Sequence, residues 1–155
     1  MAQEHSGIKI VAQNKYIRRL FEVMETLEAG LVLTGSEIKS IRAGKVSFKD
    51  SHVVFSGNEA FIKGLHIGVY ENAGYAGHEP DRDRKLLLHK REIDVLRGKV
   101  EQKGLAVVPL RMYLKHSKAK LEIALAKGKK VHDQREELKR RAVQRDLARE
   151  MSRYK

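Results

Sequence analysis

The sequence predicts a mainly β fold with helices, a small closed or partly open barrel, followed by a basic C-terminal tail. Apolar stretches of strand length recur through the first 126 residues, and turn signals separate them. Two amphipathic helical patterns interrupt these strands. From residue 127 charged residues replace the apolar stretches. We therefore expect a barrel domain over 1–126, with an N-terminal arm over 1–13, and a tail over 127–155 that is flexible when free and can become helical.

Charge indicates the class of partner. The 155 residues carry a net charge of +12 and a pI near 10.0, which favours a polyanion, with nucleic acid first and an anionic membrane surface second. Cysteine is absent, which excludes a disulfide framework and thiolate chemistry. No apolar run has the length of a signal peptide or of a membrane span, so a cytoplasmic protein is expected.

The first half of the chain predicts an arm, a strand and a helix. Residues 8–12 are an arm or a brief strand, and 14–19 form a basic segment. Residues 20–33 predict a strand with a bulge near 28–30. Thr34-Gly35-Ser36-Glu37 then matches a capping box, and Gly44 ends the helix. Helical spacing places Ile38 and Ile41 on one face, with Ser36, Lys39 and Ser40 pointing away and Arg42 on the flank.

The second half predicts two hairpins around a second helix. Strands over 51–55 and 59–67 flank the turn Ser56-Gly57-Asn58, and a helix over 90–102 ends at Gly104. Strands over 104–114 and 118–126 form the second hairpin, where Pro109 indicates an edge strand or a bulge. The intervening loop, 72–84, clusters His78, Glu79, Asp81 and Asp83. Their spacing matches no recognised metal or catalytic site, so a solvated loop is favoured.

The tail has a periodic charge pattern. Eleven basic and five acidic residues over 127–155 give it +6 of the total +12. On a helix, Arg141, Arg145, Arg149 and Arg153 share one side, and Val143, Leu147, Met151 and Tyr154 share the opposite side. An RNA-binding segment, a membrane-surface helix and a solvated appendage all fit this pattern.

No catalytic constellation is present in the sequence. The seven histidines are dispersed, and neither a phosphate-binding glycine loop nor a zinc spacing occurs. We therefore expect a binding protein without enzymatic activity or cofactor. Lysine and arginine would contact phosphates, and structured RNA would be recognised through its loops and 2′-hydroxyls.

Four blocks of the sequence, 30–53, 82–93, 104–114 and 124–137, resemble the SsrA-binding protein family (small protein B), the partner of transfer-messenger RNA in bacterial ribosome rescue. The resemblance implies an oligonucleotide-binding (OB-like) barrel that acts as a monomer. The barrel would bind the tRNA-like domain of transfer-messenger RNA, where the anticodon arm is missing, and deliver it to stalled ribosomes for trans-translation. The tail would enter the empty messenger channel and sense the decoding centre of the small subunit.

The same resemblance assigns candidate residues. Those near the tRNA-like domain are Asn14, Lys15, Glu37, Lys39, Arg42, His89 and Lys90. Those in the tail are Lys127, Gly128, Lys129, Lys130, His132, Asp133 and Arg135, followed by the arginines at 141, 145, 149 and 153. Glu37 is either a helix cap or an RNA contact. Arg19-Leu20-Phe21 and Gln134 depart from the family pattern. A general RNA chaperone or ribosome-associated factor is the alternative, and an RNA-processing enzyme is a third.

Overall fold

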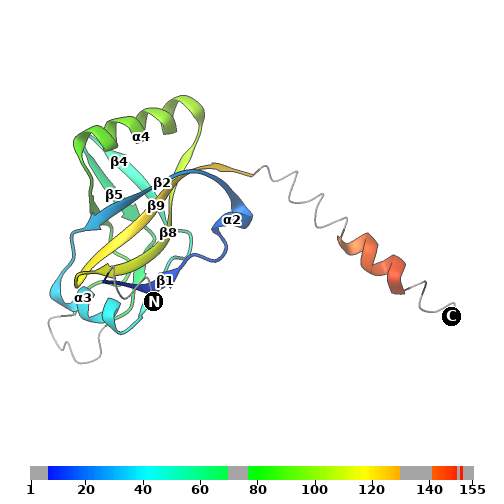
Figure 1. The fold of residues 1–155 in the computed structure, drawn as a ribbon, viewed down its shortest axis with the longest axis horizontal. Coiled ribbons are helices and arrows are strands. Elements are labelled where there is room, and N and C mark those ends of the chain that lie inside the picture. Colours follow the sequence, from blue (N-terminus) through cyan, green and yellow to red (C-terminus); the bar gives the residue numbers. More distant parts are fainter. Residues whose placement is uncertain (1–6, 70–76, 130–140, 150, 152–155) are drawn as a thin grey trace.

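A curled antiparallel sheet forms the body of the protein (Figure 1). The computed structural model describes residues 7–69, 77–129, 141–149 and 151. In spatial order the strands are β1 (Ile8–Gln13), β8 (Ala106–Lys115), β9 (Lys118–Gly128), β2 (Phe21–Leu31), β7 (Arg84–Leu87), β5 (Glu59–Lys63) and β4 (His52–Ser56). The last strand, β4, also lies beside β8. The sheet therefore closes into a small, partly open barrel, which confirms the predicted fold class.

The hairpin of β8 and β9 is the longest regular part of the barrel. Its turn, His116 and Ser117, has positive φ at both residues, the backbone that matches the twist of a two-residue hairpin. The register shifts between Pro109 and Arg111, so the predicted bulge is present. The strand is not an edge, however, because β1 pairs with its other side. The segment 8–12, expected as an arm or a brief strand, thus belongs to β1.

The bulge in β2 lies elsewhere than predicted. The register against β9 shifts between Val23 and Glu25, and it is regular through 28–30. Gly30 has a different role there, because a Cβ at this position would lie 3.1 Å from the Cβ of Leu87. The glycine permits the close approach of β7.

One further strand prediction was wrong, and one strand was not predicted. The expected strand over 59–67 breaks at Gly64, whose φ is +79°, and residues beyond it form β6 (His66–Ile67), which pairs with β3 (Val46–Ser47) in a separate small sheet. The strand β7 was not predicted at all. Buried and exposed side chains do alternate along β7, with Arg84 and Leu86 buried. The sequence did not indicate this pattern, because an arginine is rarely a buried residue.

The helices follow the local signals more closely. The predicted capping box forms at α3 (Gly35–Arg42), and α4 (Lys90–Lys103) ends at Gly104, which has a left-handed φ of 62°. Ser40 was expected to point outward, but it is fully buried on a helix that packs against β6. A four-residue helix, α2 (Ile17–Leu20), was not predicted.

Apolar side chains pack on both sides of the sheet. The barrel interior holds the main core, including Ile41, Met112 and Leu121, all with no exposed surface. The helix α4 covers one end of the barrel (Figure 1) through Ile93 and Leu96. A smaller cluster outside the barrel packs α2 onto β8 and β9. This second cluster fixes the basic segment that contains α2.

The tail begins later than the composition suggests. Strand β9 continues to Gly128 instead of ending at residue 126, and the backbone N–H of Lys129 donates to the carbonyl of Leu20 at 2.9 Å. Residues 141–149 and 151 are helical, and each of them is exposed. Within the described residues, no helix combines the length and the apolar character needed to cross a membrane.

Candidate nucleic-acid interface

The helix α3 presents Lys39 and Arg42 on an exposed surface. Its first turn is closed by two reciprocal hydrogen bonds. The backbone N–H of Thr34 donates to Oε1 of Glu37 at 2.9 Å, and the backbone N–H of Glu37 donates to Oγ1 of Thr34 at 3.2 Å. These bonds satisfy two of the free N–H groups at the helix start. The capping role expected for Glu37 is therefore present.

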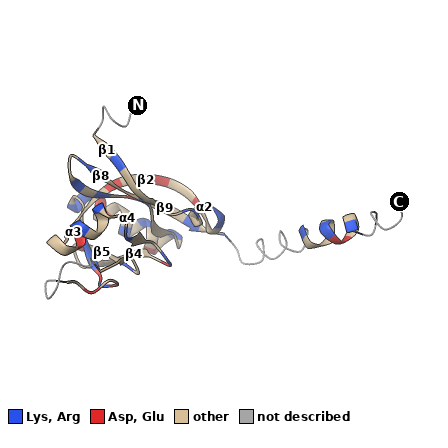
Figure 2. Cartoon of the chain, turned by 90° about the horizontal axis from the view of Figure 1, so that it is seen from below, with Lys and Arg blue, Asp and Glu red and all other residues tan. Residues whose placement is uncertain are grey.

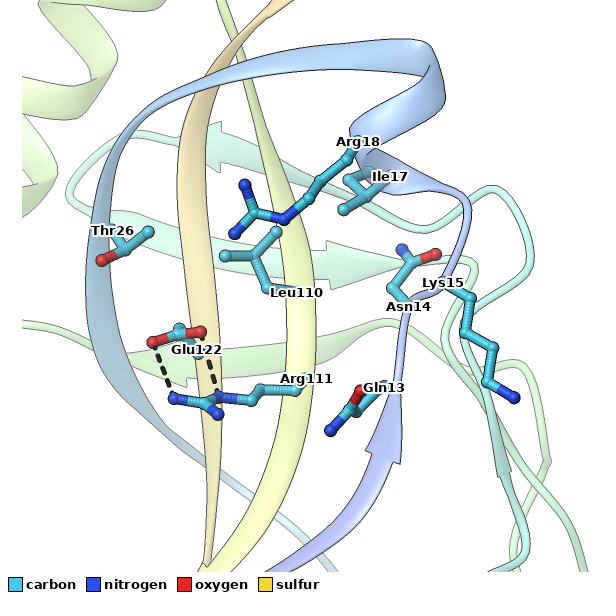
Figure 3. A pocket seen from close by; sticks show the side chains of 9 residues that line it. All are labelled: Gln13, Asn14, Lys15, Ile17, Arg18, Thr26, Leu110, Arg111 and Glu122. Carbon is cyan, nitrogen blue, oxygen red and sulfur yellow. Dashed lines mark hydrogen bonds and ion pairs between the residues drawn. The ribbon is translucent and has the colours of Figure 1, made fainter.

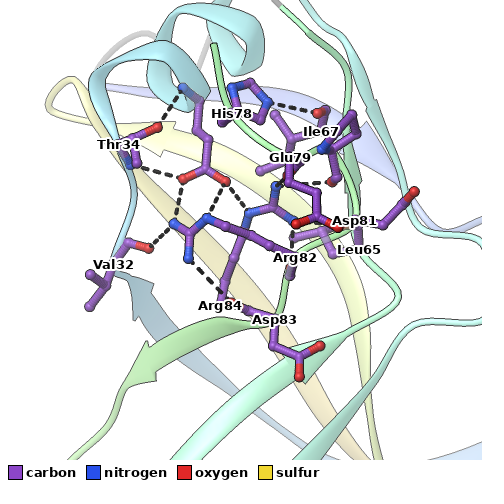
Figure 4. A network of polar contacts seen from close by, with 12 residues as sticks. Val32, Thr34, Leu65, Ile67, His78, Glu79, Asp81, Arg82, Asp83 and Arg84 are labelled. Carbon is purple, nitrogen blue, oxygen red and sulfur yellow. Dashed lines mark hydrogen bonds and ion pairs between the residues drawn. The ribbon is translucent and has the colours of Figure 1, made fainter. Parts of the chain in front are cut away.

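Glu37 also accepts from Arg82, which lies just before β7, and from Arg84, the first residue of β7; both arginines are labelled in Figure 4. Arg82 donates through Nε to Oε2 at 3.0 Å and through its terminal nitrogen to Oε1 at 2.5 Å. Arg84 donates through Nε to Oε2. The carboxylate has no exposed surface, whereas the Arg82 side chain keeps 31% of its surface exposed. The Arg82 side chain is therefore partly exposed, and its guanidinium also donates to the carbonyls of Val32 at 3.3 Å and Asp83 at 3.2 Å.

Burial and charge act in opposite directions on this cluster. Burial would raise the pKa of the Glu37 carboxyl, but hydrogen bonds from Arg82, the Thr34 backbone and Arg84 hold that pKa below its ordinary value. Burial likewise lowers the pKa of Arg84, and Glu37 opposes that change. Both groups are therefore charged at neutral pH, as a buried pair requires.

Backbone carbonyls satisfy the remaining donors of Arg84. One terminal nitrogen donates to the carbonyl of Leu65 at 2.7 Å and to that of Arg82 at 3.1 Å. The other donates to the carbonyl of Pro80 at 3.0 Å. A single buried guanidinium thus joins α3, the turn before β6 and the chain leading into β7.

In the described part of the loop, 77–83, the acidic residues Glu79, Asp81 and Asp83 are exposed, as a solvated loop requires, whereas His78 is partly buried and anchored. His78 lies 2.8 Å from Oγ of Ser36 through Nδ1 and 2.8 Å from the Ile67 carbonyl through Nε2. Asp81 lies 2.9 Å from Nδ1 of His66, whose hydrogen bond lowers the pKa of that carboxyl. His78 therefore pairs with Ser36, and Asp81 pairs with His66. Within the described residues, no three metal-ligating side chains come together.

The basic segment before β2 forms one wall of a polar cavity of about 590 Å³ (Figure 3). Asn14 is held by two bonds to β8, from Nδ2 to the Pro109 carbonyl at 3.0 Å and from its N–H to the Leu110 carbonyl at 2.7 Å. Lys15 and Arg18 are both exposed, and both line the cavity. Arg111, on the far side, is paired with Glu122 at 3.1 Å. Lys15, Arg18 and Arg111 therefore supply the cationic part of the cavity lining.

His89 and Lys90 begin α4 and are both exposed. His89 is the residue before the first helical turn, and its backbone N–H donates to Oε1 of Glu92 at 2.9 Å. The bond fixes the direction in which the helix leaves β7. Both side chains stay accessible to a partner.

The structure accounts for part of the predicted tail site. Lys127 and Gly128 lie in β9 opposite Glu22 and Phe21, so they belong to the barrel. Arg141, Arg145 and Arg149 lie one turn apart on the exposed helix, where Figure 2 shows the arginines in blue. The remaining predicted residues lie outside the described part of the chain: Lys130, His132, Asp133, Arg135 and Arg153. Arg82 is absent from the sequence-based list, and only the fold places it beside the predicted residue Glu37. Arg18, which belongs to the basic segment 14–19 but was not listed, lines the same cavity as Asn14 and Lys15.

Comparisons with known proteins identify the family. The family model described as SmpB protein matches residues 11–153. An SsrA-binding protein of Solidesulfovibrio magneticus is 61% identical over 154 residues, covering 99% of this chain and all of that protein. One of Nostoc punctiforme is 52% identical over 155 residues, again covering 99% of this chain and all of that protein.

A solved structure matches the same fold. It is described by the words "tmRNA-SmpB: a journey to the center of the bacterial ribosome", and it aligns with a TM-score of 0.66 and 48% identity. The alignment covers 77% of this chain and 85% of the other. With a family match over nearly the whole length and relatives above 50% identity, the chain belongs to the SmpB protein family.

Proposed function

We propose that this protein binds transfer-messenger RNA and acts with it on stalled ribosomes in trans-translation. The observation that supports this most strongly is the family match over residues 11–153, together with full-length relatives named SsrA-binding protein. The matched solved structure carries tmRNA, SmpB and the ribosome in its description, which supports the same pair of partners. The protein acts in this proposal as a monomeric, cytoplasmic binding factor without cofactor or catalytic step.

The barrel would hold the tRNA-like domain through three sets of side chains. These are Asn14 and Lys15 before α2, Lys39 and Arg42 on α3, and His89 and Lys90 at the start of α4. All of these side chains except that of Asn14 are exposed. Asn14 is fixed by its bond to the Pro109 carbonyl, and α3 and α4 are each fixed by a helix cap. Cationic side chains on a rigid scaffold bind phosphates at low conformational cost.

Glu37 has a supporting position in this proposal. Its carboxylate is buried and already accepts from Thr34, Arg82 and Arg84. It would hold α3 and Arg82 in place for the RNA. The tail, from residue 129 onward, would supply the contacts with the messenger channel and decoding centre through its basic side chains.

Selective binding tests the proposal. The purified protein is titrated with the tRNA-like domain of transfer-messenger RNA and with bulk tRNA, and the RNA that co-purifies from the host is sequenced. We expect transfer-messenger RNA to be enriched and the tRNA-like domain to bind more tightly. Equal affinity for all structured RNAs would support a general RNA chaperone instead. RNA cleavage by the protein would support the third candidate, a processing enzyme.

A further inference from the structure

An apolar groove of about 880 Å³ opens beside α2. Phe21 of β2 and Val108 of β8 line it, together with Tyr16, which precedes α2, and Leu20, which ends it. Tyr16 is 65% exposed and Leu20 is 43% exposed. Pockets that hold small ligands have volumes of roughly 300–1,000 Å³, and exposed apolar side chains around one hollow are typical of binding sites. The groove is therefore large enough for a small organic ligand or for one unit of a longer chain.

Contacts within the barrel domain hold the shape of this groove. The backbone N–H of Lys129 donates to the carbonyl of Leu20 at 2.9 Å, which ties the end of α2 to the end of β9. Ile17 is 5% exposed and packs in one cluster with Ala124 and Ala126 of β9. Because the walls are fixed without a ligand, binding costs little conformational entropy.

The charged residues of the lining favour an anionic ligand. Arg19, Lys49 and Lys129 line the groove with a single carboxylate, that of Asp50. Lys49 lies 3.6 Å from Asp81, whereas neither Arg19 nor Lys129 forms an ion pair with another described residue. These cationic groups attract an anion to the apolar surface and repel a basic partner.

Tyr16 and Arg19 form a stacked pair in this lining. The guanidinium carbon of Arg19 lies 5.7 Å from the centre of the Tyr16 ring, and the attraction between a cation and an aromatic face stabilises this contact. Unpaired nucleobases stack on exposed aromatic rings and guanidinium groups whatever the base sequence, while nearby cationic groups contact the phosphates. An unpaired nucleotide therefore matches both the apolar surface and the charge of the groove.

A buried hydroxyl in the lining lacks a partner. Ser51 is 5% exposed, and its Oγ has no hydrogen-bond partner among the described residues. Its backbone is fixed, since the N–H of Ser51 donates to the carbonyl of Phe48 at 2.8 Å. Buried polar groups are rarely left unsatisfied, and a bound ligand is one way to supply the missing bond. A hydroxyl both donates and accepts, so it suits the mixed donors and acceptors on the edge of any nucleobase.

The groove adjoins residues that the proposed function assigns to RNA. Asn14 and Ile17 line both the groove and the polar cavity of Figure 3, which Lys15 lines as well. RNA that contacts Asn14 and Lys15 can therefore continue into the groove. Arg19 and Leu20 belong to the three residues that depart from the family pattern, so this part of the surface is particular to this chain.

We propose that the groove beside α2 binds an unpaired nucleotide of transfer-messenger RNA, next to the part of that RNA that contacts Asn14 and Lys15. The base lies against Tyr16 and Leu20 with its edge toward the Ser51 hydroxyl. The adjoining phosphates face the cationic groups of the lining. This inference rests on the proposed function, because it adds a contact with the same RNA.

Removal of the aromatic ring is the first test. Tyr16→Ala should lower the affinity for transfer-messenger RNA by about fivefold or more, the usual loss when a stacking side chain is replaced by alanine. Tyr16→Phe keeps the ring and should retain most of the affinity. The melting temperature should change little in both variants, since this side chain is 65% exposed.

A reference variant separates this inference from the proposed function. Lys39→Ala with Arg42→Ala removes the charges of α3, which the proposed function places on the same RNA. If the reference lowers the affinity and Tyr16→Ala does not, the groove contact is refuted and the proposed function stands. If the wild type binds all structured RNAs equally, the proposed function itself fails.

A negative charge placed in the groove is the second test. Leu20→Glu sets a carboxylate where the phosphates approach, so the affinity for transfer-messenger RNA should fall by about fivefold or more. Met24→Glu is the matched control, because it adds the same charge at an exposed apolar side chain of β2 that does not line the groove. It should lower the affinity by less than about twofold. Equal losses in the two variants would reflect net charge alone and overturn the groove contact.

Ser51→Ala separates a ligand contact from a structural role. The hydroxyl has no partner among the described residues, so its removal should not lower the melting temperature, whereas the affinity should fall by about threefold, as for one typical hydrogen bond. Ser40→Ala is the matched control, since its Oγ is likewise buried without a described partner but does not line the groove. A lower melting temperature with unchanged affinity would overturn the place given to the edge of the base.

Crosslinking identifies the occupant. Tyr16 is replaced by the photoreactive p-benzoylphenylalanine in the full chain, the complex with purified transfer-messenger RNA is irradiated, and the crosslinked nucleotide is mapped. We expect a crosslink to an unpaired nucleotide of this RNA in the absence of ribosomes. Crosslinks to base-paired nucleotides alone overturn the proposal. Crosslinks that form only when ribosomes are added, and that lie in ribosomal RNA or in a ribosomal protein, overturn it in favour of that partner.

Discussion

Glu37 of α3 and Arg84 of β7 form an ion pair in which neither side chain has any exposed surface. They are 47 residues apart in the sequence, and each completes the hydrogen bonds of a different element. The pair joins the capped helix to the central part of the sheet. Several consequences of this contact can be measured separately from RNA binding.

Replacement of Glu37 by glutamine should destabilise the fold. Glutamine can keep the capping bond to Thr34, but it leaves Arg84 buried without a countercharge. We expect a loss of roughly 3 kcal/mol in the free energy of unfolding, measured by urea denaturation, as for one broken member of a buried pair. Glu92→Gln is the matched control, since Glu92 also closes a capping box but at an exposed position, and it should cost less than about 1 kcal/mol. Equal losses would show that the charge of Glu37 has no special importance.

Stability should also depend on pH in the acid range. Against the opposing effect of burial, the pKa of the Glu37 carboxyl is held below the ordinary value of 4.5 in the folded state, mainly by its hydrogen bonds, so its contribution to stability is complete above pH 4.5 and is lost as the pH falls through the folded-state pKa. The stability difference between the wild type and Glu37→Gln should therefore be constant near neutrality and shrink below about pH 4.5. Unfolding measured in urea at several pH values checks this. A difference that stays constant down to pH 3 would contradict the assignment.

RNA binding by α3 can be tested through its salt dependence. Lys39→Ala with Arg42→Ala removes two exposed charges from a helix whose cap and core contacts remain. Affinity for the tRNA-like domain should fall, and the slope of log affinity against log salt should drop by about 2 at most, roughly one per lost phosphate contact. The control is Lys118→Ala with Lys63→Ala, two exposed lysines outside the proposed contact sets. An unchanged slope with an intact fold would exclude α3 from the interface.

The barrel and the tail should separate in function. A chain stopped after Lys129 keeps all the pairs of β9 and the bond to Leu20, so its melting temperature and its affinity for the tRNA-like domain should stay close to wild type. Peptide tagging on stalled ribosomes should be lost. A chain stopped after Ala124 is the structural control, because it removes paired residues of β9 and should melt lower. Normal tagging by the first truncation would make the tail a solvated appendage.

Charge reversal of the tail arginines tests the same division without shortening the chain. Arg141→Glu, Arg145→Glu and Arg149→Glu alter one exposed helical face and no residue of the core. We expect tagging to fall while the melting temperature stays unchanged. Gln144→Glu adds a negative charge off that face and serves as the control. A comparable loss of tagging in the control would mean that negative charge added anywhere on this helix impairs tagging, and that the arginine face has no specific role.

Elements whose determining contacts are local were predictable from the sequence alone. The capping box links Thr34 to Glu37 over three residues, and Gly104 ends α4 with its own φ. The two hairpins, the basic tail and the family resemblance likewise depend on neighbouring residues or on ordered motifs. Short-range hydrogen bonds and φ preferences act within a few residues, so they leave a signature in the sequence itself.

Tertiary structure decided everything that depends on partners far along the chain. From the sequence alone, Arg84 would be placed on the surface. In the structure its guanidinium is surrounded by Glu37, Leu65 and Pro80. The same holds for β7, which approaches β2 closely at Gly30, and for the apolar groove of about 880 Å³ beside α2, which forms where α2, β8 and the end of β9 meet. Burial of a charge is stable only when its counterions and acceptors converge, and no local pattern encodes that convergence.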